Sequence, residues 1–325
     1  MNELIPAFEF QRVFIAPWTE NISSTVWIVL MGFLVTVACG WVGNYLILRR
    51  MALVGDAISH SVLPGLAIAF LLTNSRGSWA MFLGAMVAGV MTTVIIEMIH
   101  KKTRVKQDAA IGIAFTSLFA VGVILISLFA SRIDLDQECV LYGEIAFVPL
   151  DEPVSLGGIE IGPLPVARML VVAALTLLWI VLFYKELLVS SFDAALAFSL
   201  GINATLVHYC LMGWLSVVVV SAFESVGAIL VVAMLILPGA TASLLSHRLP
   251  VIMALTALHS ALSAVLGFHL ATWLECSIAG AMVVAGAGVF CAAWILSSSQ
   301  GLLTRLVRHR TDGDGSRSLE LGAET

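Results

Sequence analysis

The stretch Gly55-Asp56-Ala57-Ile58-Ser59-His60 lies inside an apolar run of residues 53–72. Its carboxylate and imidazole are four residues apart, which places them on one face of a helix. A charged side chain at the centre of a bilayer costs about 2.5–3.5 kcal/mol on insertion scales, so an acid kept there is usually functional. Asp and His are also a suitable ligand pair for a divalent cation. The stretch predicts a membrane helix with a metal-binding pair; the alternative is an Asp–His hydrogen bond that holds two helices together.

The composition of the rest of the chain is that of a membrane protein. Of 325 residues, 60% are hydrophobic and 11% are charged, whereas soluble domains carry about 25% charged residues. We therefore expect an all-α, polytopic integral membrane helical bundle. No basic block with interleaved aromatics is present, so nucleic acid is not an expected partner. The five cysteines form no CxxC pair and fit small hydrophobic positions rather than a thiolate metal site.

The hydropathy pattern predicts about nine membrane spans within a transmembrane domain of residues 27–300. The run 205–245 is too long for one span, so two must share it. An outer or interfacial segment, 1–26, precedes the domain, and a disordered cytoplasmic tail, 301–325, follows it. The expected spans are 27–48, 53–72, 79–99, 109–130, 166–184, 205–222, 225–245, 250–271 and 277–298.

The basic residues give the expected orientation. With the C-terminus in the cytoplasm, twelve Lys and Arg residues lie inside and four lie outside, as the positive-inside rule requires. The longest non-spanning stretch, 131–165, then lies outside. It holds seven acids, and it contains a candidate hairpin around Gly157-Gly158.

A second intramembrane acid, Glu224, lies in the stretch Ser221–Ser225, where the run 205–245 must turn. Two spans in this run leave about 20 residues each, barely enough for a hydrocarbon core of about 30 Å. The turn is therefore expected to lie below the outer surface, where Glu224 joins Asp56 and His60. The alternative is a glutamate in a surface-exposed outer turn.

Residues 190–204 form a short amphipathic segment on the expected inner side. Ser191 is a candidate helix cap, Phe192, Leu196 and Leu200 form one apolar stripe, and Gly201 is a natural stop. A helix too short to span, with an apolar stripe, fits a groove on a partner protein. The alternative is an interfacial helix that rests on lipid.

The sequence lacks the motifs that are typical of several other function classes. There is no H-E-x-x-H and no G-x-x-x-x-G-K-[ST], so we do not expect an enzyme; if ATP supplies the energy for this protein, a separate chain must hydrolyse it. No permanently bound cofactor is expected. A transporter driven by an ion gradient, with Asp56 and His60 as a proton relay, remains an alternative, as does a siderophore- or cobalamin-type permease.

Four stretches together resemble the metal-ion ABC transporter permeases, the zinc, manganese and iron uptake group. The stretches are 49–65, 108–113, 192–201 and 226–242. The resemblance implies a type II ABC importer-like fold in a bacterial plasma or inner membrane.

The resemblance also implies partners and site residues. The partners are a second permease subunit, a cytoplasmic ATP-binding subunit and an extracytoplasmic metal-binding protein. Asp56, His60 and Glu224 match positions that contact the transported ion, which is manganese, zinc or iron. The ATPase-coupling helix matches Phe192, Asp193, Leu196, Leu200 and Gly201.

Overall fold

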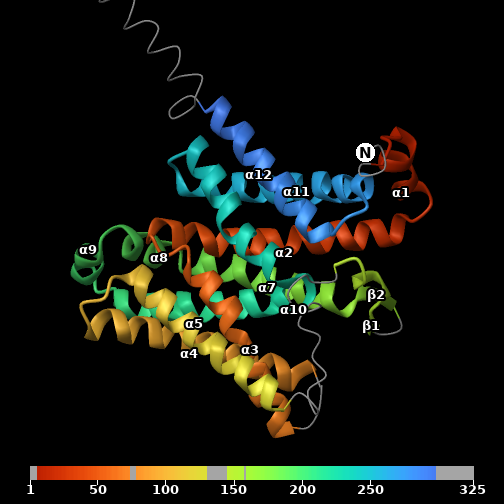
Figure 1. The fold of residues 1–325 in the computed structure, drawn as a ribbon. Coiled ribbons are helices and arrows are strands. Elements are labelled where there is room, and N and C mark those ends of the chain that lie inside the picture. The colour runs from red at the N-terminus through yellow and green to blue at the C-terminus, as the bar shows by residue number, and fades with distance from the viewer. Residues whose placement is uncertain (1–5, 74–77, 130–144, 157–158, 298–325) are drawn as a thin grey trace, which may run out of the picture.

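The computed structural model describes residues 6–73, 78–129, 145–156 and 159–297, and most of them are helical (Figure 1). Long apolar segments form the helices because a backbone in lipid must satisfy its hydrogen bonds within the segment. The elements are η1 (Gln11–Ile15), α1 (Ala16–Thr19), α2 (Ile22–Leu48), α3 (Val54–Thr73), α4 (Ser78–Lys102), α5 (Gln107–Leu128), η2 (Val148–Leu150), β1 (Pro153–Leu156), β2 (Ile159–Pro163), α7 (Leu164–Leu182), α8 (Tyr184–Phe192), α9 (Ala194–Ser199), α10 (Ala204–Leu245), α11 (Leu249–Leu274) and α12 (Ile278–Leu296).

The predicted membrane bundle is confirmed. Eight helical segments in the described part of the chain are long and apolar enough to cross a bilayer, and Leu230–Leu245 is a shorter apolar helix. These nine segments correspond to the nine expected spans. The shared run 205–245 divides into Ala204–Phe223 and Leu230–Leu245.

The break within α10 is at Gly227, two residues beyond the expected turn. Gly227 has φ 74° and ψ 171°, a conformation that glycine adopts without a steric penalty. The chain reverses direction there, because residues on both sides of the break contact the same end of α2. His208 contacts Arg49, and a Cβ on Gly239 would lie 2.6 Å from the Asn44 side chain.

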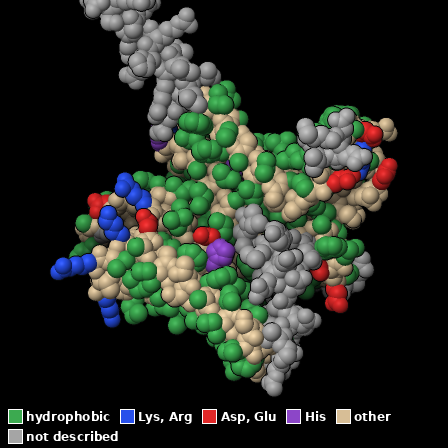
Figure 2. Space-filling model, in the orientation of Figure 1, with side chains coloured by type: hydrophobic (Ala, Val, Ile, Leu, Met, Phe, Trp, Pro, Cys, Tyr) green, Lys and Arg blue, Asp and Glu red, His purple; other side chains and the backbone are tan. Residues whose placement is uncertain are grey.

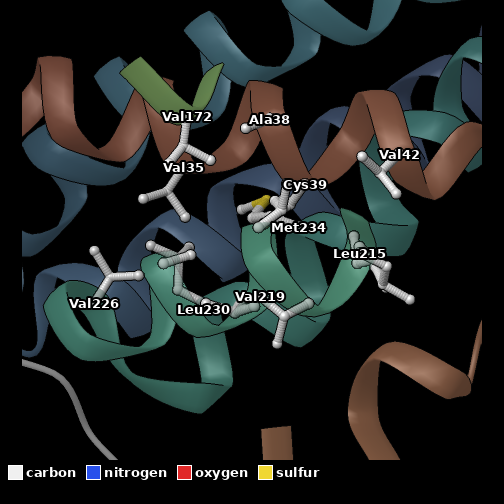
Figure 3. Close-up of a cluster of buried hydrophobic side chains, with 14 of the residues drawn as sticks. Val35, Ala38, Cys39, Val42, Val172, Leu215, Val219, Val226, Leu230 and Met234 are labelled. Atoms are coloured by element: carbon white, nitrogen blue, oxygen red, sulfur yellow. The ribbon is translucent and has the colours of Figure 1, made fainter. Parts of the chain in front are cut away.

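The centre of the bundle is α2, which packs against α7, α10 and α11. Figure 3 shows Val35, Cys39 and Val42 of α2 facing Leu215 and Met234 of α10. Cys39 is fully buried among these apolar side chains. It therefore fills a small hydrophobic position, as the sequence predicted.

Helices α3, α4 and α5 form a second group beside this core. Gly65 of α3 and Gly84 of α4 face each other, and a Cβ on Gly84 would lie 2.6 Å from the Gly65 carbonyl oxygen. Small residues at such a crossing let two membrane helices approach closely. This packing holds the helix that carries Asp56 and His60.

The molecule has two chemically different ends (Figures 1 and 2). Most Lys and Arg side chains visible in Figure 2 gather at the end formed by α8 and α9. The opposite end carries the N-terminal helices and the β1–β2 hairpin, whose antiparallel pairing confirms the hairpin expected around Gly157-Gly158. The first part of the acidic stretch, residues 131–144, lies outside the described residues, but Asp151 and Glu152 are exposed at this end.

The N-terminal segment packs against the end of α11 rather than standing apart from the bundle. Val13 accepts a hydrogen bond from the His269 ring at Nδ1 (2.9 Å), and Pro6 accepts one from Trp273 (3.2 Å). Arg12 also pairs with Glu275. These contacts fix the described part of the expected outer segment 1–26 to the helical bundle.

Candidate functional site

The structure places Asp56 and His60 on one face of α3, with His60 Nε2 3.4 Å from Asp56 Oδ1. The two side chains are 35% and 32% exposed, respectively, whereas Ala57, Ile58 and Ser61 between and beside them are buried. The pair lies within one helix and retains an accessible face. This geometry does not support the alternative in which a buried Asp–His bond joins two helices.

Aromatic rings of α5 flank the imidazole. The ring centroids of Phe115 and Phe119 lie 5.8 and 5.9 Å from that of His60. One turn further along α3, Pro64 is inside the helix, and because proline has no N–H it leaves the His60 carbonyl without its usual helical donor. A carboxylate, an imidazole and a free carbonyl thus occur within two turns of one helix, and all three are possible ligands for a divalent cation.

Glu224 belongs to α10, three residues before the break at Gly227. Its side chain lies outside the part of the structure that is described. Val220, one turn earlier on α10, belongs to one small apolar cluster with Val62 of α3 and Ala85 of α4. Val62 is two residues beyond His60. The described side chains contain no group of three or more His, Cys, Asp and Glu that is close enough to hold a metal.

The amphipathic segment is present, but its predicted cap is wrong. Asp193 caps α9, since its carboxylate accepts the N–H groups of Ala195 (2.8 Å) and Leu196 (3.1 Å). Ser191 instead belongs to α8, where its hydroxyl donates to the Leu187 carbonyl oxygen at 2.6 Å. Gly201 has φ 78° and follows the end of α9, so the predicted helix stop is confirmed.

The expected apolar stripe is also distributed differently. Phe192 ends α8, while Leu196 lies in α9, and the extended conformation of Asp193 separates them. All three predicted residues, Phe192, Leu196 and Leu200, are exposed. The sequence reasoning missed Phe198, which is 83% exposed. The apolar tip formed by Phe192, Leu196, Phe198 and Leu200 is called the docking tip below.

A pocket of about 310 Å³ opens at the α8–α9 end, beside the first residue of α3. Its lining includes Arg49, Val54, Glu97 and His208. Val54 is only two residues before Asp56. Glu97 of α4 forms an ion pair with Lys101, four residues later, at 2.7 Å. His208 also approaches this carboxylate, at 3.4 Å. The sequence did not predict the second contact, because Glu97 and His208 are far apart in the chain.

A bundle of helices long enough to span a membrane, with an Asp–His pair on one of them and a short helix exposed at one end, is the arrangement expected of a transport permease. The sequence model of the ABC 3 transport family matches residues 21–297. The chain belongs to this family and is a membrane permease component of an ABC transporter, not an enzyme.

Individual relatives agree with this assignment. The chain is 46% identical to the manganese transport system membrane protein MntD of Bacillus subtilis, covering 88% of this chain and 96% of the relative. It is 40% identical to the zinc transport system membrane protein TroD of Treponema pallidum, covering 86% and 76%. Among solved structures, PsaBC from Streptococcus pneumoniae in complex with Fab matches with a TM-score of 0.72 and 32% identity, covering 93% of this chain and all of that chain.

Proposed function

We propose that this chain is the permease subunit of an ATP-driven importer that moves a divalent metal ion into the cytoplasm, with manganese as the first candidate and zinc as the second. The observation that carries the proposal is the half-exposed Asp56–His60 pair on one face of α3, in a chain of the ABC 3 transport family. The names of MntD and TroD support manganese and zinc, respectively.

The metal contacts Asp56 and His60 during transport, and Glu224 supplies a third ligand. The position of α10 supports this role for Glu224, because Val220 belongs to the same apolar cluster as Val62, which is two residues beyond His60. Two carboxylates brought together repel unless a proton or a cation neutralises them. A divalent cation therefore stabilises the arrangement in which both face His60.

The docking tip binds a cytoplasmic ATP-binding subunit. Exposed Phe192, Leu196, Phe198 and Leu200 at the basic end of the molecule support this proposal. The same end then faces the cytoplasm, in agreement with the positive-inside rule. Ser297 Oγ donates to the Leu244 carbonyl oxygen at 2.8 Å, so the end of α12 lies beside the end of α10; this contact supports a cytoplasmic location for the residues that follow α12.

The opposite end, with β1, β2 and the exposed acids Asp151 and Glu152, receives the cation from an extracytoplasmic metal-binding protein. Acidic residues at a pathway entrance raise the local cation concentration. A second permease subunit completes the transporter in the membrane. The ABC 3 family assignment favours ATP as the energy source over an ion gradient.

The experiment is uptake of radioactive manganese and zinc, measured separately, in cells that lack their own importers and express this chain with its ATP-binding partner. Asp56→Asn and His60→Gln are expected to abolish uptake of the transported metal at limiting concentration. The matched controls are Asp108→Asn and His100→Gln, which change exposed residues at the basic end. Normal uptake by either pathway variant, with protein present in the membrane, contradicts the assigned ligand role.

A further inference from the structure

Arg49 connects segments that are far apart in the sequence. Its Nε donates to Ser191 Oγ at 3.0 Å, and its Nη2 donates to Ser190 Oγ at 2.9 Å. Both serines lie in the last turn of α8, immediately before α9. Its Nη1 lies 3.2 Å from His208 Nδ1, near the start of α10. One guanidinium group therefore ties the end of α2 to both α8 and α10.

The direction of the hydrogen bonds extends this connection to α4. An arginine side chain has no acceptor, so Nδ1 of His208 must accept from Arg49 and its neutral ring carries the proton on Nε2. Nε2 faces Glu97 Oε1 at 3.4 Å. Because this nitrogen is protonated and points at a carboxylate, the arrangement is a polar network and not a metal site.

The connection from Arg49 to the metal pair is short and rigid. The Met51 N–H donates to the Leu46 carbonyl oxygen (2.8 Å), and the Arg50 N–H donates to the Ile47 carbonyl oxygen (3.0 Å). This is a Schellman motif, in which Arg50 takes the left-handed position with φ 59°. Helix α3 begins at Val54, and Asp56 lies in its first turn. Only this hydrogen-bonded turn and the start of α3 separate Arg49 from Asp56.

The pocket beside the network gives it room to rearrange. Arg49, Glu97 and His208 all border its volume of about 310 Å³. Side chains at the edge of a pocket can change partners without displacing a packed core, whereas closely packed side chains cannot. The network thus joins two packed groups, α3–α5 and α2–α10, at a point where movement is possible.

We infer that Arg49 is a positioning residue that couples the docking tip to the metal pair. When the ATP-binding subunit moves the tip, Ser190 and Ser191 pull on Arg49, and the turn at Arg50 passes the motion to Asp56. This inference rests on the proposed docking role of the tip. In this inference Arg49 binds neither the ATP-binding subunit nor the metal; its role is to couple ATP hydrolysis to movement of the metal.

The test uses the complete transporter, with its ATP-binding subunit and metal-binding protein, in proteoliposomes. The readout is the number of manganese ions transported per ATP hydrolysed. Arg49→Gln is expected to lower this ratio by about tenfold or more, since it removes charge-assisted hydrogen bonds to three partners. Arg49→Lys is expected to give a transport ratio between those of Arg49→Gln and the wild type, because one ammonium group cannot donate to three partners as the planar guanidinium does.

Two further variants make the assignment specific. Arg104→Gln is the matched control: it makes the same substitution at an exposed guanidinium in the loop between α4 and α5, which takes no part in the Arg49 network. The double variant Ser190→Ala with Ser191→Ala removes only the α8 side of the network. If Arg49 acts through these serines, adding Arg49→Gln to the double variant lowers the ratio little further.

The outcomes separate this inference from the proposed function. A normal ratio for Arg49→Gln, with normal transport by the wild type, overturns the inference alone. The inference is also overturned if Arg49→Gln lowers the transport ratio as much in the serine double variant as it does in the wild type. It is overturned as well if weaker binding of the ATP-binding subunit accounts for the lower ratio. Absence of manganese transport by the wild-type complex overturns the proposed function and this inference together.

Discussion

The exposed side chains of the docking tip determine how much each should contribute to binding the ATP-binding subunit. Phe198 is 83% exposed, and full burial of a phenylalanine side chain is worth about 1.5–3 kcal/mol. Docking can therefore bury enough of Phe198 to contribute about 2 kcal/mol, so Phe198→Ala should weaken binding of the ATP-binding subunit about thirtyfold. Leu196 is 49% exposed, and Leu196→Ala should weaken binding about fivefold.

The assay is a dissociation constant for the ATP-binding subunit, measured with the permease in lipid nanodiscs. Phe10→Ala is the control, because Phe10 is 62% exposed but lies at the opposite end of the molecule. All three side chains are exposed, so none of the variants should lower the thermal stability of the permease. Dissociation constants for Phe198→Ala and Leu196→Ala that equal the Phe10→Ala value would refute the docking assignment.

Three further predictions test other parts of the account. Asp151→Cys should react with an impermeant thiol reagent in intact cells, and labelling only after lysis would invert the orientation. Glu224→Cys with His60→Cys, in a background without native cysteines, should be bridged by cadmium or a short crosslinker; failure of every reagent would remove Glu224 from the site. Gly84→Val should destabilise the α3–α4 crossing by about 1–3 kcal/mol, measured by thermal unfolding, because a Cβ at Gly84 would lie 2.6 Å from the Gly65 carbonyl oxygen. Gly288→Ala is the control: a Cβ there meets nothing within 4 Å, so this variant should unfold at the wild-type temperature.

Local spacing explains what could be predicted from the sequence. Asp56 and His60 share a helix face because four residues make about one turn. The two spans in 205–245 follow from length alone, and Gly227 marks the break because it has the backbone freedom that a reversal needs. Such features depend on residues close together in the chain.

Long-range contacts explain what could not be predicted. Ser191 looked like a helix cap, but Arg49, which is 142 residues away, binds its hydroxyl group in the folded chain. The cap is then Asp193, two residues later. Likewise, Glu97 and His208 meet only because α4 and α10 pack together. No local pattern contains the information that these residues are neighbours.

The central claim is that the transported metal binds His60 beside Asp56, and electron paramagnetic resonance of bound manganese tests it most directly. The spectrum of the purified transporter loaded with manganese should show electron spin-echo modulation from an imidazole nitrogen. We predict that His60→Gln removes this nitrogen coupling, while His100→Gln, which changes an exposed histidine near the end of α4, leaves it intact. Bound manganese with unchanged nitrogen coupling in His60→Gln would contradict the account.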